Sequence, residues 1–415
     1  MKKSHKFILT LLAVLTLLLL GNPSSTYASG PTYSRFGVGD LVRNGHGRID
    51  AMGGAGIALV GDGFINGLNP AGLTKISLTR ISGGFEYSSY YSNDGVNSSR
   101  YSRGMFEGVS FAIPIAKSLG ITMLMESSPF SNVNYAIEQK DSVLTQNFYG
   151  AGGLSLLSLG GSVSPMKSLS LGLKVNYVFG RIEQVAKFTF ADPSFTNSQI
   201  DRSNYYSGFT FTLGSIYEGV GRLLKSSFLD SLSLGFVLTT PAVLSVTHES
   251  ILTTSASFDT TATGSGTVDL PLAIGVGASY AFSDRYHVTG DFSFENWGSA
   301  KFFGSHPADI RNSTRVALGF EALPSRETGS FWGTVVYRAG IYYHSTYYRV
   351  NGQPIDEWFV TGGLGIPIGP DARMNVGLHA GIRGTTSANL QRDTIFGLTL
   401  SLSASEAWFL KIEEE

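Results

Sequence analysis

The sequence contains no cysteine. A disulfide framework and a thiolate metal site are therefore both excluded. An acylated lipoprotein N-terminus is excluded too, because it needs a cysteine at the cleavage site.

Charged residues are scarce, at 15% of the chain, against about 25% in soluble domains. The shortfall indicates that a large surface does not face water. Mean hydropathy is nevertheless only +0.09, too low for a bundle of transmembrane helices. A membrane β-barrel fits both observations, because only every second residue of such a strand must be apolar.

Neither sign of charge is in excess, since 30 basic and 31 acidic residues give a formal net charge of −1. Nucleic-acid binding requires a basic surface that attracts phosphates. We therefore expect no nucleic-acid partner.

The first 28 residues have the order of a secretory signal. Lys2, Lys3 and Lys6 precede an apolar run over 7–20, and Ala28 ends a small-x-small cleavage site. The run is short for a membrane span, which needs about 20 residues. We predict a signal peptide over 1–28, with an uncleaved anchor as the alternative. No later stretch of 18 apolar residues occurs, so no transmembrane helix is expected.

From Thr74 onward, apolar residues alternate with small or polar ones, as over 169–179 and 270–282. This period of two predicts β-strands. The runs exceed the five or six residues typical of soluble strands and match the roughly 9–11 residues of a tilted membrane strand. Aromatic residues cluster near run ends, as over 342–348, which is typical of interfacial girdles. The pattern favours a membrane barrel over a soluble sandwich.

We predict an all-β transmembrane fold: an antiparallel outer-membrane β-barrel of about 14 strands over residues 74–415. The candidate strands lie near 74–91, 101–116, 118–138, 143–163, 168–189, 201–217, 230–249, 268–282, 285–301, 311–322, 331–348, 354–368, 371–386 and 391–411. Tight turns at 283–284 and 369–371 alternate with longer polar connections at 92–100, at 191–202 and from Gln184 onward. This rhythm predicts short turns on one rim and long loops on the other.

Residues 29–73 do not alternate and are rich in glycine. They are too irregular for a strand and too apolar for a free linker. We predict that they form a small N-terminal plug inside the lumen, where small residues allow close approach to the wall.

Two segments of the predicted plug, over 51–56 (AMGGAG) and 67–73 (GLNPAGL), resemble the start of the FadL family of outer-membrane transporters. Weaker matches are the strand over 269–277 with the later Trp297, and the sequence over 238–241. The resemblance covers most of the mature chain. It implies a 14-stranded barrel with a plug and no cofactor. It also implies passive, ligand-gated uptake of hydrophobic molecules such as long-chain fatty acids, which pass sideways through the wall.

Candidate site residues fall into two groups. The plug residues predicted to bind or gate a ligand are Met52, Gly53, Gly54, Ile57, Leu59, Phe64, Leu68, Asn69 and Pro70. The polar residues predicted to face the lumen are Glu126, Lys174, His287, Asp291, Glu295, Arg315, Arg338 and Arg383.

His287, Asp291 and Glu295 share one face of a predicted strand, which would suit a lumenal acid or base. We favour a polar lumen in which such groups pair with basic residues of other strands, and we expect no enzyme. The seven histidines are scattered and indicate no metal site.

The expected partners are outer-membrane lipid, a hydrophobic ligand and a possible protein at the extracellular loops. The alternative function is a structural or protein-secretion accessory barrel without small-molecule cargo. A transporter should show an apolar pocket that opens outward and through the wall. An accessory should show a sealed wall and a large exposed loop patch.

Overall fold

The computed structural model describes residues 31–43, 45–254, 257–325, 330–369 and 371–406. The predicted signal peptide, Pro370 of a predicted turn and the last nine residues lie outside these ranges.

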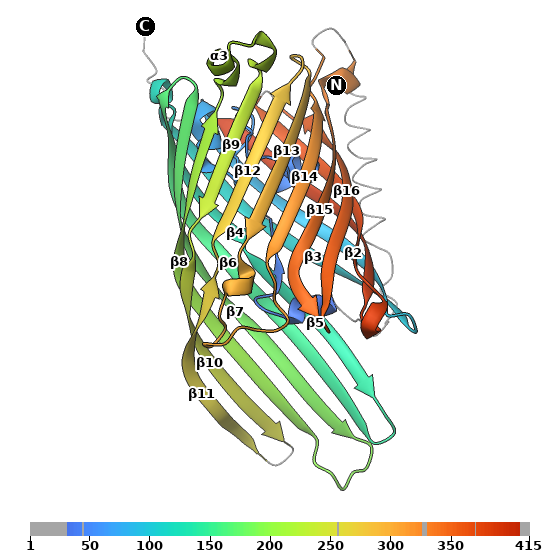
Figure 1. Cartoon of the computed structure of the whole chain (residues 1–415). Helices are drawn as coiled ribbons and strands as arrows, with labels where there is room; N and C mark the ends of the chain where they lie inside the picture. Colours follow the sequence, from blue (N-terminus) through green and yellow to red (C-terminus); the bar gives the residue numbers. More distant parts are fainter. Residues whose placement is uncertain (1–30, 44, 255–256, 326–329, 370, 407–415) are drawn as a thin grey trace.

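The wall is one antiparallel sheet that closes on itself where β18 pairs with β2 (Figure 1). Its strands are β2 (Thr79–Asn93), β3 (Ser98–Ala116), β4 (Ile121–Pro129), β5 (Ser131–Lys140), β6 (Leu144–Met166), β7 (Leu169–Phe190), β8 (Ser198–Tyr217), β9 (Leu232–Thr239), β10 (Ala242–Thr254), β11 (Phe258–Leu270), β12 (Ala273–Ala281), β13 (Tyr286–Glu295), β14 (Ser313–Ala322), β15 (Val336–Val350), β16 (Gln353–Pro367), β17 (Ala372–Gly384) and β18 (Arg392–Glu406).

Three wall strands are interrupted. β4 and β5 are separated by Phe130, β9 and β10 by residues 240–241, and β11 and β12 by residues 271–272. Proline stands in two of these breaks, where it removes a backbone donor from the ladder. With each interrupted pair counted as one strand, the barrel has fourteen strands, which confirms the prediction.

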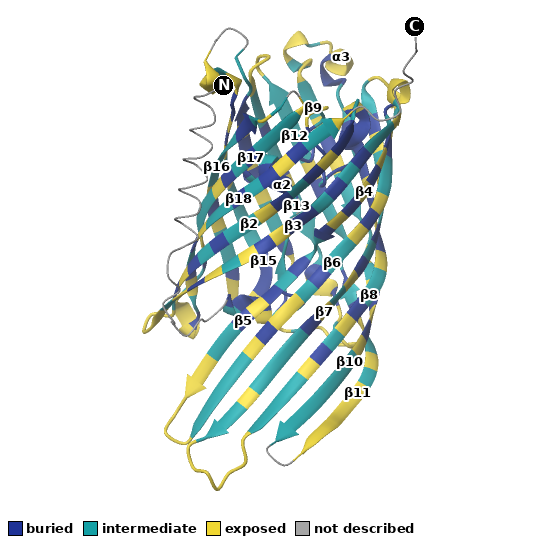
Figure 2. Cartoon of the chain, turned by 180° about the vertical axis from the view of Figure 1, so that it is seen from behind, coloured by how far each residue is buried: buried dark blue, intermediate teal, exposed yellow. Residues whose placement is uncertain are grey.

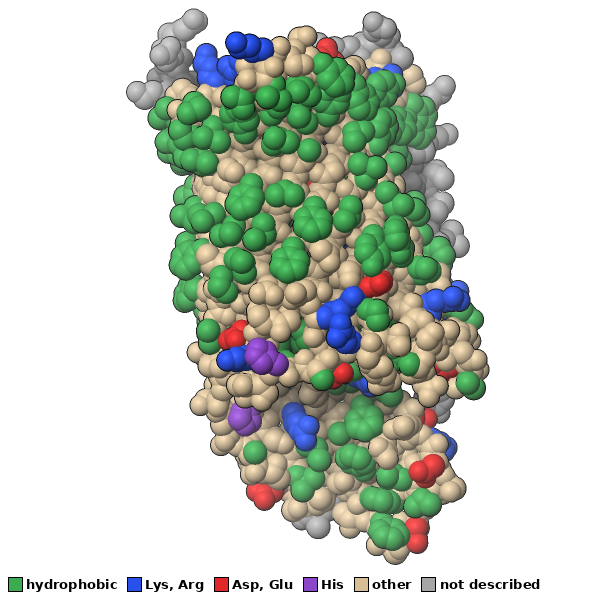
Figure 3. All heavy atoms as spheres, viewed as in Figure 1, with side chains coloured by type: hydrophobic (Ala, Val, Ile, Leu, Met, Phe, Trp, Pro, Cys, Tyr) green, Lys and Arg blue, Asp and Glu red, His purple; other side chains and the backbone are tan. Residues whose placement is uncertain are grey.

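Large apolar side chains point outward from the wall. On β6 and β7 they include Leu157, Leu159, Leu171 and Leu173, all exposed. Figure 3 shows hydrophobic side chains in bands over the wall and charged side chains toward its two ends. Exposed apolar residues arranged this way form the bilayer-facing belt of an outer-membrane barrel. No helix among the described residues is long and apolar enough to cross a membrane.

The two rims differ in height. We call the rim where β2 begins and β18 ends the terminal rim. On the opposite rim, three hairpins project far beyond the rest of the barrel (Figures 1 and 2). We call this part the extension and define it as residues 133–152, 182–204, 248–254 and 257–264. They lie on and beyond the cross-strand row Val133–Gly152–Ile182–Asn204–His248–Gly264.

The extension corrects the predicted loops. Residues from Gln184 to Phe190 continue β7 instead of forming a connection, and β8 already begins at Ser198. The predicted connection at 92–100 shrinks to the short link between Asn93 and Ser98. The polar composition of these segments suggested loops. However, every second residue still packs against a neighbouring strand, which is sufficient for a ladder.

The plug runs through the lumen from one rim to the other. Its elements are η1 (Thr32–Arg35), β1 (Asp40–Leu41), α2 (His46–Asp50) and η2 (Pro70–Lys75). The remaining short helices lie in connections: η3 (Lys117–Leu119), α3 (Val220–Leu224), η4 (Ser227–Leu229), η5 (Trp297–Ser299), η6 (Phe331–Thr334) and η7 (Ser387–Asn389).

The helix η2 delays the first wall strand to Thr79, five residues later than predicted. The Asn69 side chain caps η2 by accepting from Ala71 N, and Pro70 occupies the first turn. Asparagine followed by proline favours a helical start because proline fixes φ and needs no donor there.

Candidate functional site

The first anchor of the plug is a buried carboxylate. Glu321 of β14 is 1% exposed. It accepts from Arg48 of the plug at 2.6 Å and from Arg338 of β15 at 2.8 Å. Charge-assisted bonds of this kind are about twice as strong as neutral ones. Glu321 therefore ties α2 of the plug to the wall.

The second anchor is Asp291 of β13, which binds plug backbone. Its carboxylate accepts from Gly56 N at 2.7 Å and from Ile57 N at 3.1 Å. The guanidinium of Arg43, also in the plug, lies 3.4 Å away. A single wall carboxylate thus satisfies two amides of a segment that has no regular structure.

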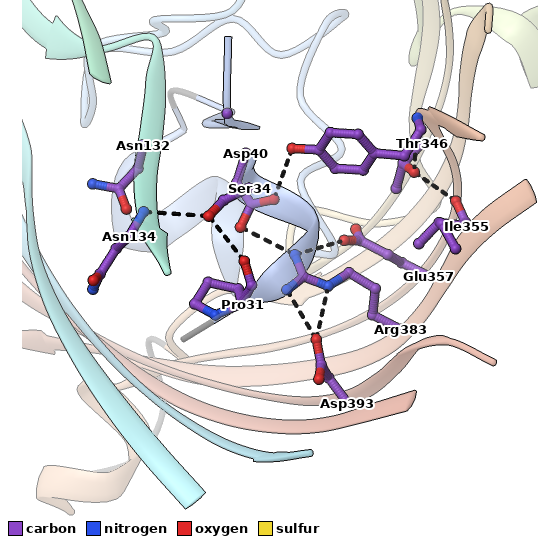
Figure 4. Close-up of polar contacts among 12 residues, drawn as sticks. Pro31, Ser34, Asp40, Asn132, Asn134, Thr346, Ile355, Glu357, Arg383 and Asp393 are labelled. Carbon is purple, nitrogen blue, oxygen red and sulfur yellow. Dashed lines mark hydrogen bonds and ion pairs between the residues drawn. The ribbon is translucent and has the colours of Figure 1, made fainter. Parts of the chain in front are cut away.

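The third anchor lies near the extended rim (Figure 4). Arg383 of β17 contacts Asp40 of the plug at 3.1 Å, Asp393 at 3.0 Å and Glu357 at 3.8 Å. Its guanidinium is almost completely buried. Three carboxylates around one arginine give the cluster a net negative charge. The Tyr348 hydroxyl stabilises one of these carboxylates by donating a hydrogen bond to Asp40 at 2.9 Å.

Glycines of the plug allow close contact with the wall. Gly53 has a φ of +68°. Its N–H donates to Thr361 Oγ1 at 2.8 Å, and its carbonyl accepts from Arg315 at 2.8 Å. A Cβ at Gly53 would lie 2.9 Å from the carbonyl oxygen of Ile341. Glycine is required here for both conformation and space.

Most apolar residues predicted to bind a ligand are buried in the plug itself. Met52, Leu59 and Phe64 pack with Ile49 in one cluster, against which Leu68 lies partly buried. Arg48 lies over the Phe64 ring at 4.1 Å. Of the predicted apolar plug residues, only Leu68 lines the lumenal cavity.

Asn69 and Pro70 join the plug to the wall. The Asn69 amide is fully buried and donates to the carbonyls of Ile57, Ser215 and Phe236. Pro70 is buried beside Gly172 of β7. Both residues occupy structural positions at the plug exit. We keep the predicted gating role of this junction as a proposal.

The other predicted lumenal residues also face inward. Glu126 and Lys174 pair at 3.1 Å, and Lys174 also donates to the plug carbonyl of Gly67. Glu295 accepts from the Trp297 indole at 2.6 Å. His287 lies beside Glu321 in the β13–β14 register.

Sequence reasoning missed the plug partners of these residues. Asp40, Arg43 and Arg48 face wall groups of opposite charge. The prediction paired wall residues with each other, which holds for Glu126 with Lys174. Asp291, however, binds the plug. The sequence did contain a signal for these contacts. The three charged residues lie in a glycine-rich segment that has few other charged residues.

A cavity of about 420 Å³ lies between the plug and the wall. Its lining mixes aromatic and aliphatic side chains with ionised ones. Tyr90, Met105, Phe130, Phe359 and Ile395 contribute apolar surface, and the ionisable lining includes Glu86, Arg103, Glu107, Lys174, Arg315 and Arg383.

Apolar clusters lie on both sides of this cavity. Toward the extended rim, Tyr33 and Val38 of the plug pack with Trp297, Tyr347 and Tyr348. Toward the terminal rim, plug and wall meet in a cluster of Ile65, Leu73, Ile76, Ala112 and Leu124.

The plug carries perturbed ionisable groups at the cavity. Burial, together with the nearby Glu86 carboxylate, raises the pKa of Asp50 to about 7. Burial lowers the pKa of His46 and brings the pKa of Arg43 down to about 10. A carboxyl group that changes charge near neutral pH therefore faces the lumen.

The wall ladder is incomplete between β3 and β5. β3 pairs with β4 only from Val109 to Ala116, whereas residues 98–106 and Gly108 pair with β2 alone. β5 pairs with β6 and, through two residues, with β1 of the plug. We call the facing stretches, residues 98–108 and 131–140, the seam.

Side chains bridge the seam where the backbones do not. Arg103 Nη1 donates to Asn132 Oδ1 at 3.2 Å. β3 bulges where the seam begins, because Glu107 has no partner in the β2 register and Gly108 has a φ of +103°. Arg103, Met105 and Glu107 all line the cavity, which therefore reaches the seam.

Within the described ranges, no group of three or more His, Asp or Glu side chains could hold a metal ion. Of the predicted acid and base candidates, Asp291 holds the plug, and Glu295 accepts from the Trp297 indole.

Solved structures of similar fold are outer-membrane channels. The toluene transporter TbuX of Ralstonia pickettii matches with a TM-score of 0.59 and 16% identity, over 88% of this chain and 99% of that one. A FadL homologue of Pseudomonas aeruginosa gives 0.61 and 14%, over 88% and 98%. The Pseudomonas putida toluene transporter TodX gives 0.58 and 15%, over 89% and 100%.

At these identities the likeness shows the fold, which is that of a plugged barrel of the bacterial outer membrane. The predicted resemblance to the FadL family is supported at this level of fold. No curated protein matches the chain. The family model that matches is BamG, not FadL, and it spans residues 4–413. The chain belongs to the BamG family.

Proposed function

We propose that the protein admits hydrophobic small molecules, such as long-chain fatty acids, by passive and ligand-gated lateral diffusion. The observation that carries the proposal is the seam, a stretch of wall without strand pairing that the lumenal cavity reaches. The fold is shared with toluene transporters.

The physical argument is desolvation. An apolar molecule gains about 25 cal/mol for each Å² removed from water. Tyr90, Met105 and Phe359 offer such surface in the cavity. The plug and its two apolar clusters occupy the lumen on both sides of this cavity. The seam then gives the ligand an exit into the hydrocarbon.

Arg103 is positioned to gate this exit. It bridges the seam to Asn132 and lies 3.7 Å from Glu86. Its Nε is buried and has no hydrogen-bond partner within the described residues. A ligand carboxylate would find a donor there and would compete with the bridge, which links binding to opening.

The test is to lock the seam. Since the chain has no cysteine, Arg103→Cys with Asn132→Cys can be joined by a reducible bifunctional thiol reagent. Uptake of radiolabelled toluene and of oleate should fall to the level of the deletion strain when locked, and should return on reduction to the level of the unreacted double variant.

The matched control is Lys187→Cys with Gln199→Cys, a directly paired position on β7 and β8 in the extension. Locking this pair should leave uptake unchanged. Equal uptake in locked and reduced seam variants would refute the lateral route. Equal uptake in wild-type and deletion strains would refute transport itself.

A second candidate function is a protein-binding accessory barrel without small-molecule cargo. The extension favours it, since neither the belt nor the cavity needs strands that project so far beyond the rim (Figure 2). The expected result is unchanged uptake on deletion together with a defect that removal of the extension reproduces.

A further inference from the structure

The extension has two sheet edges, and they differ. Its strands lie in the order β5, β6, β7, β8, β10, β11. β11 pairs with β10 along its length. On the other side, loop residues contact only its last part: Asp269 N donates to Lys301 O, and Phe303 N donates to Thr267 O. Residues 258–266 have no described backbone partner on that side.

A free edge presents a row of unpaired N–H and C=O groups. Proteins usually protect such edges with lysine, proline or a covering segment. Residues 258–266 read FDTTATGSG, with Asp259 as the single charge and no proline. Three threonines favour an extended strand, and the glycines leave the backbone accessible.

The opposite edge of the same sheet is protected. β5 carries Glu138 and Lys140 near its tip. At its base, β1 of the plug pairs with residues 131–132, and Asn134 N donates to Ser34 Oγ at 3.2 Å. The β5 edge is therefore covered at its base and charged near its tip, whereas the β11 edge is open and nearly uncharged over residues 258–266.

A second copy of this chain does not fit the open edge. The extension strands run along the barrel (Figure 1). Two copies in one membrane are related by an axis along the membrane normal, which brings their β11 edges together in parallel with identical residues opposite. A parallel ladder offsets bonded residues by one, and an antiparallel ladder would need one copy inverted.

We propose that residues 258–266 of β11 accept a β-strand from a different protein. This strand addition gives affinity through backbone hydrogen bonds. The partner segment that fits is extended, rich in β-branched residues and free of acidic residues opposite Asp259. This interaction is separate from transport, because residues 258–266 lie outside both the belt and the seam.

The experiment is hydrogen–deuterium exchange of the full chain, compared between native outer-membrane vesicles and the detergent-purified barrel. Amides of 258–266 should exchange about tenfold more slowly in the vesicles, because a ladder protects them. Residues 136–140 of β5 should exchange equally in both samples. Equal exchange of 258–266 in both samples would overturn the proposal.

The variant Ala262→Lys places a charge on the open edge and should abolish the added protection in vesicles. Gln139→Lys on β5 is the matched control and should leave it intact. Thr263→Lys serves if Ala262→Lys does not assemble. Protection that persists in the lysine variants would overturn the proposal. Protection that appears in the purified barrel and disappears on dilution would also overturn it, because it would show self-association.

Discussion

The same strands build the belt and the extension, but their apolar side chains point outward in the belt and inward in the extension. In the belt part of β7, Leu171 and Leu173 point outward, while Lys174 and Asn176 are buried. Beyond Gly180 the pattern inverts. Ile182 is buried on the inner face, and Arg181 and Lys187 are exposed.

The inversion occurs without any change of register, since β7 pairs with β8 in unbroken order from Leu169 to Phe188. Each residue therefore stays on its face while the solvent changes from hydrocarbon to water. We infer that the change of apolar face near residues 179–181 of β7 marks the edge of the bilayer. The backbone geometry of a strand is the same whichever of its two faces is apolar.

The largest expected difference in stability is between an ion pair buried in the lumen and an exposed ion pair of the extension. Glu321→Gln leaves Arg48 and Arg338 without their carboxylate and should destabilise the barrel by about 3–5 kcal/mol. Glu183→Gln in the extension removes an exposed pair with Arg181 at 3.2 Å and should cost about 0–1 kcal/mol. Denaturant unfolding in detergent measures both. Similar costs at the two sites would break the comparison.

The next difference concerns the outer surface. Leu159 in the belt and Phe195 at the tip of the extension have nearly equal exposure, 54% and 56%. Leu159→Arg should cost about 2–4 kcal/mol in a bilayer, whereas Phe195→Arg should change stability by less than about 0.5 kcal/mol. Unfolding in lipid vesicles tests this. A tolerated arginine at 159 would remove Leu159 from the belt.

The smallest expected effect is a pH dependence of the plug. The pKa of Asp50 is raised to about 7, so folding disfavours its charged form. The stability contribution is complete below the unfolded pKa and is lost as pH rises through about 7. Between about pH 5.5 and 8, wild type should lose about 2 kcal/mol relative to Asp50→Asn. Parallel unfolding midpoints for the two proteins at both pH values would contradict this.

The alternating pattern was sufficient to predict the barrel and its strand count. Runs such as 169–179 and 391–402 can satisfy their backbones in hydrocarbon only within a closed sheet. The same rule identified inward-facing residues such as Lys174 and Asp291, because a period of two assigns each residue to a face. The predicted plug also followed from local sequence, since its glycine-rich segment has no strand period.

Three features depended on the tertiary structure. Polar composition hid the extension, because strands exposed to water on one face resemble loops in sequence. The plug anchors pair residues more than 200 positions apart, such as Arg48 with Glu321, and no local pattern specifies such partners. At the seam, β5 does not pair with β3, and its first two residues pair with β1 of the plug instead. The sequence alone determined which face of the sheet each strand residue occupies. Only the tertiary structure decided which stretches of strand edge have no partner, because strand pairing depends on neighbours that are distant in the chain.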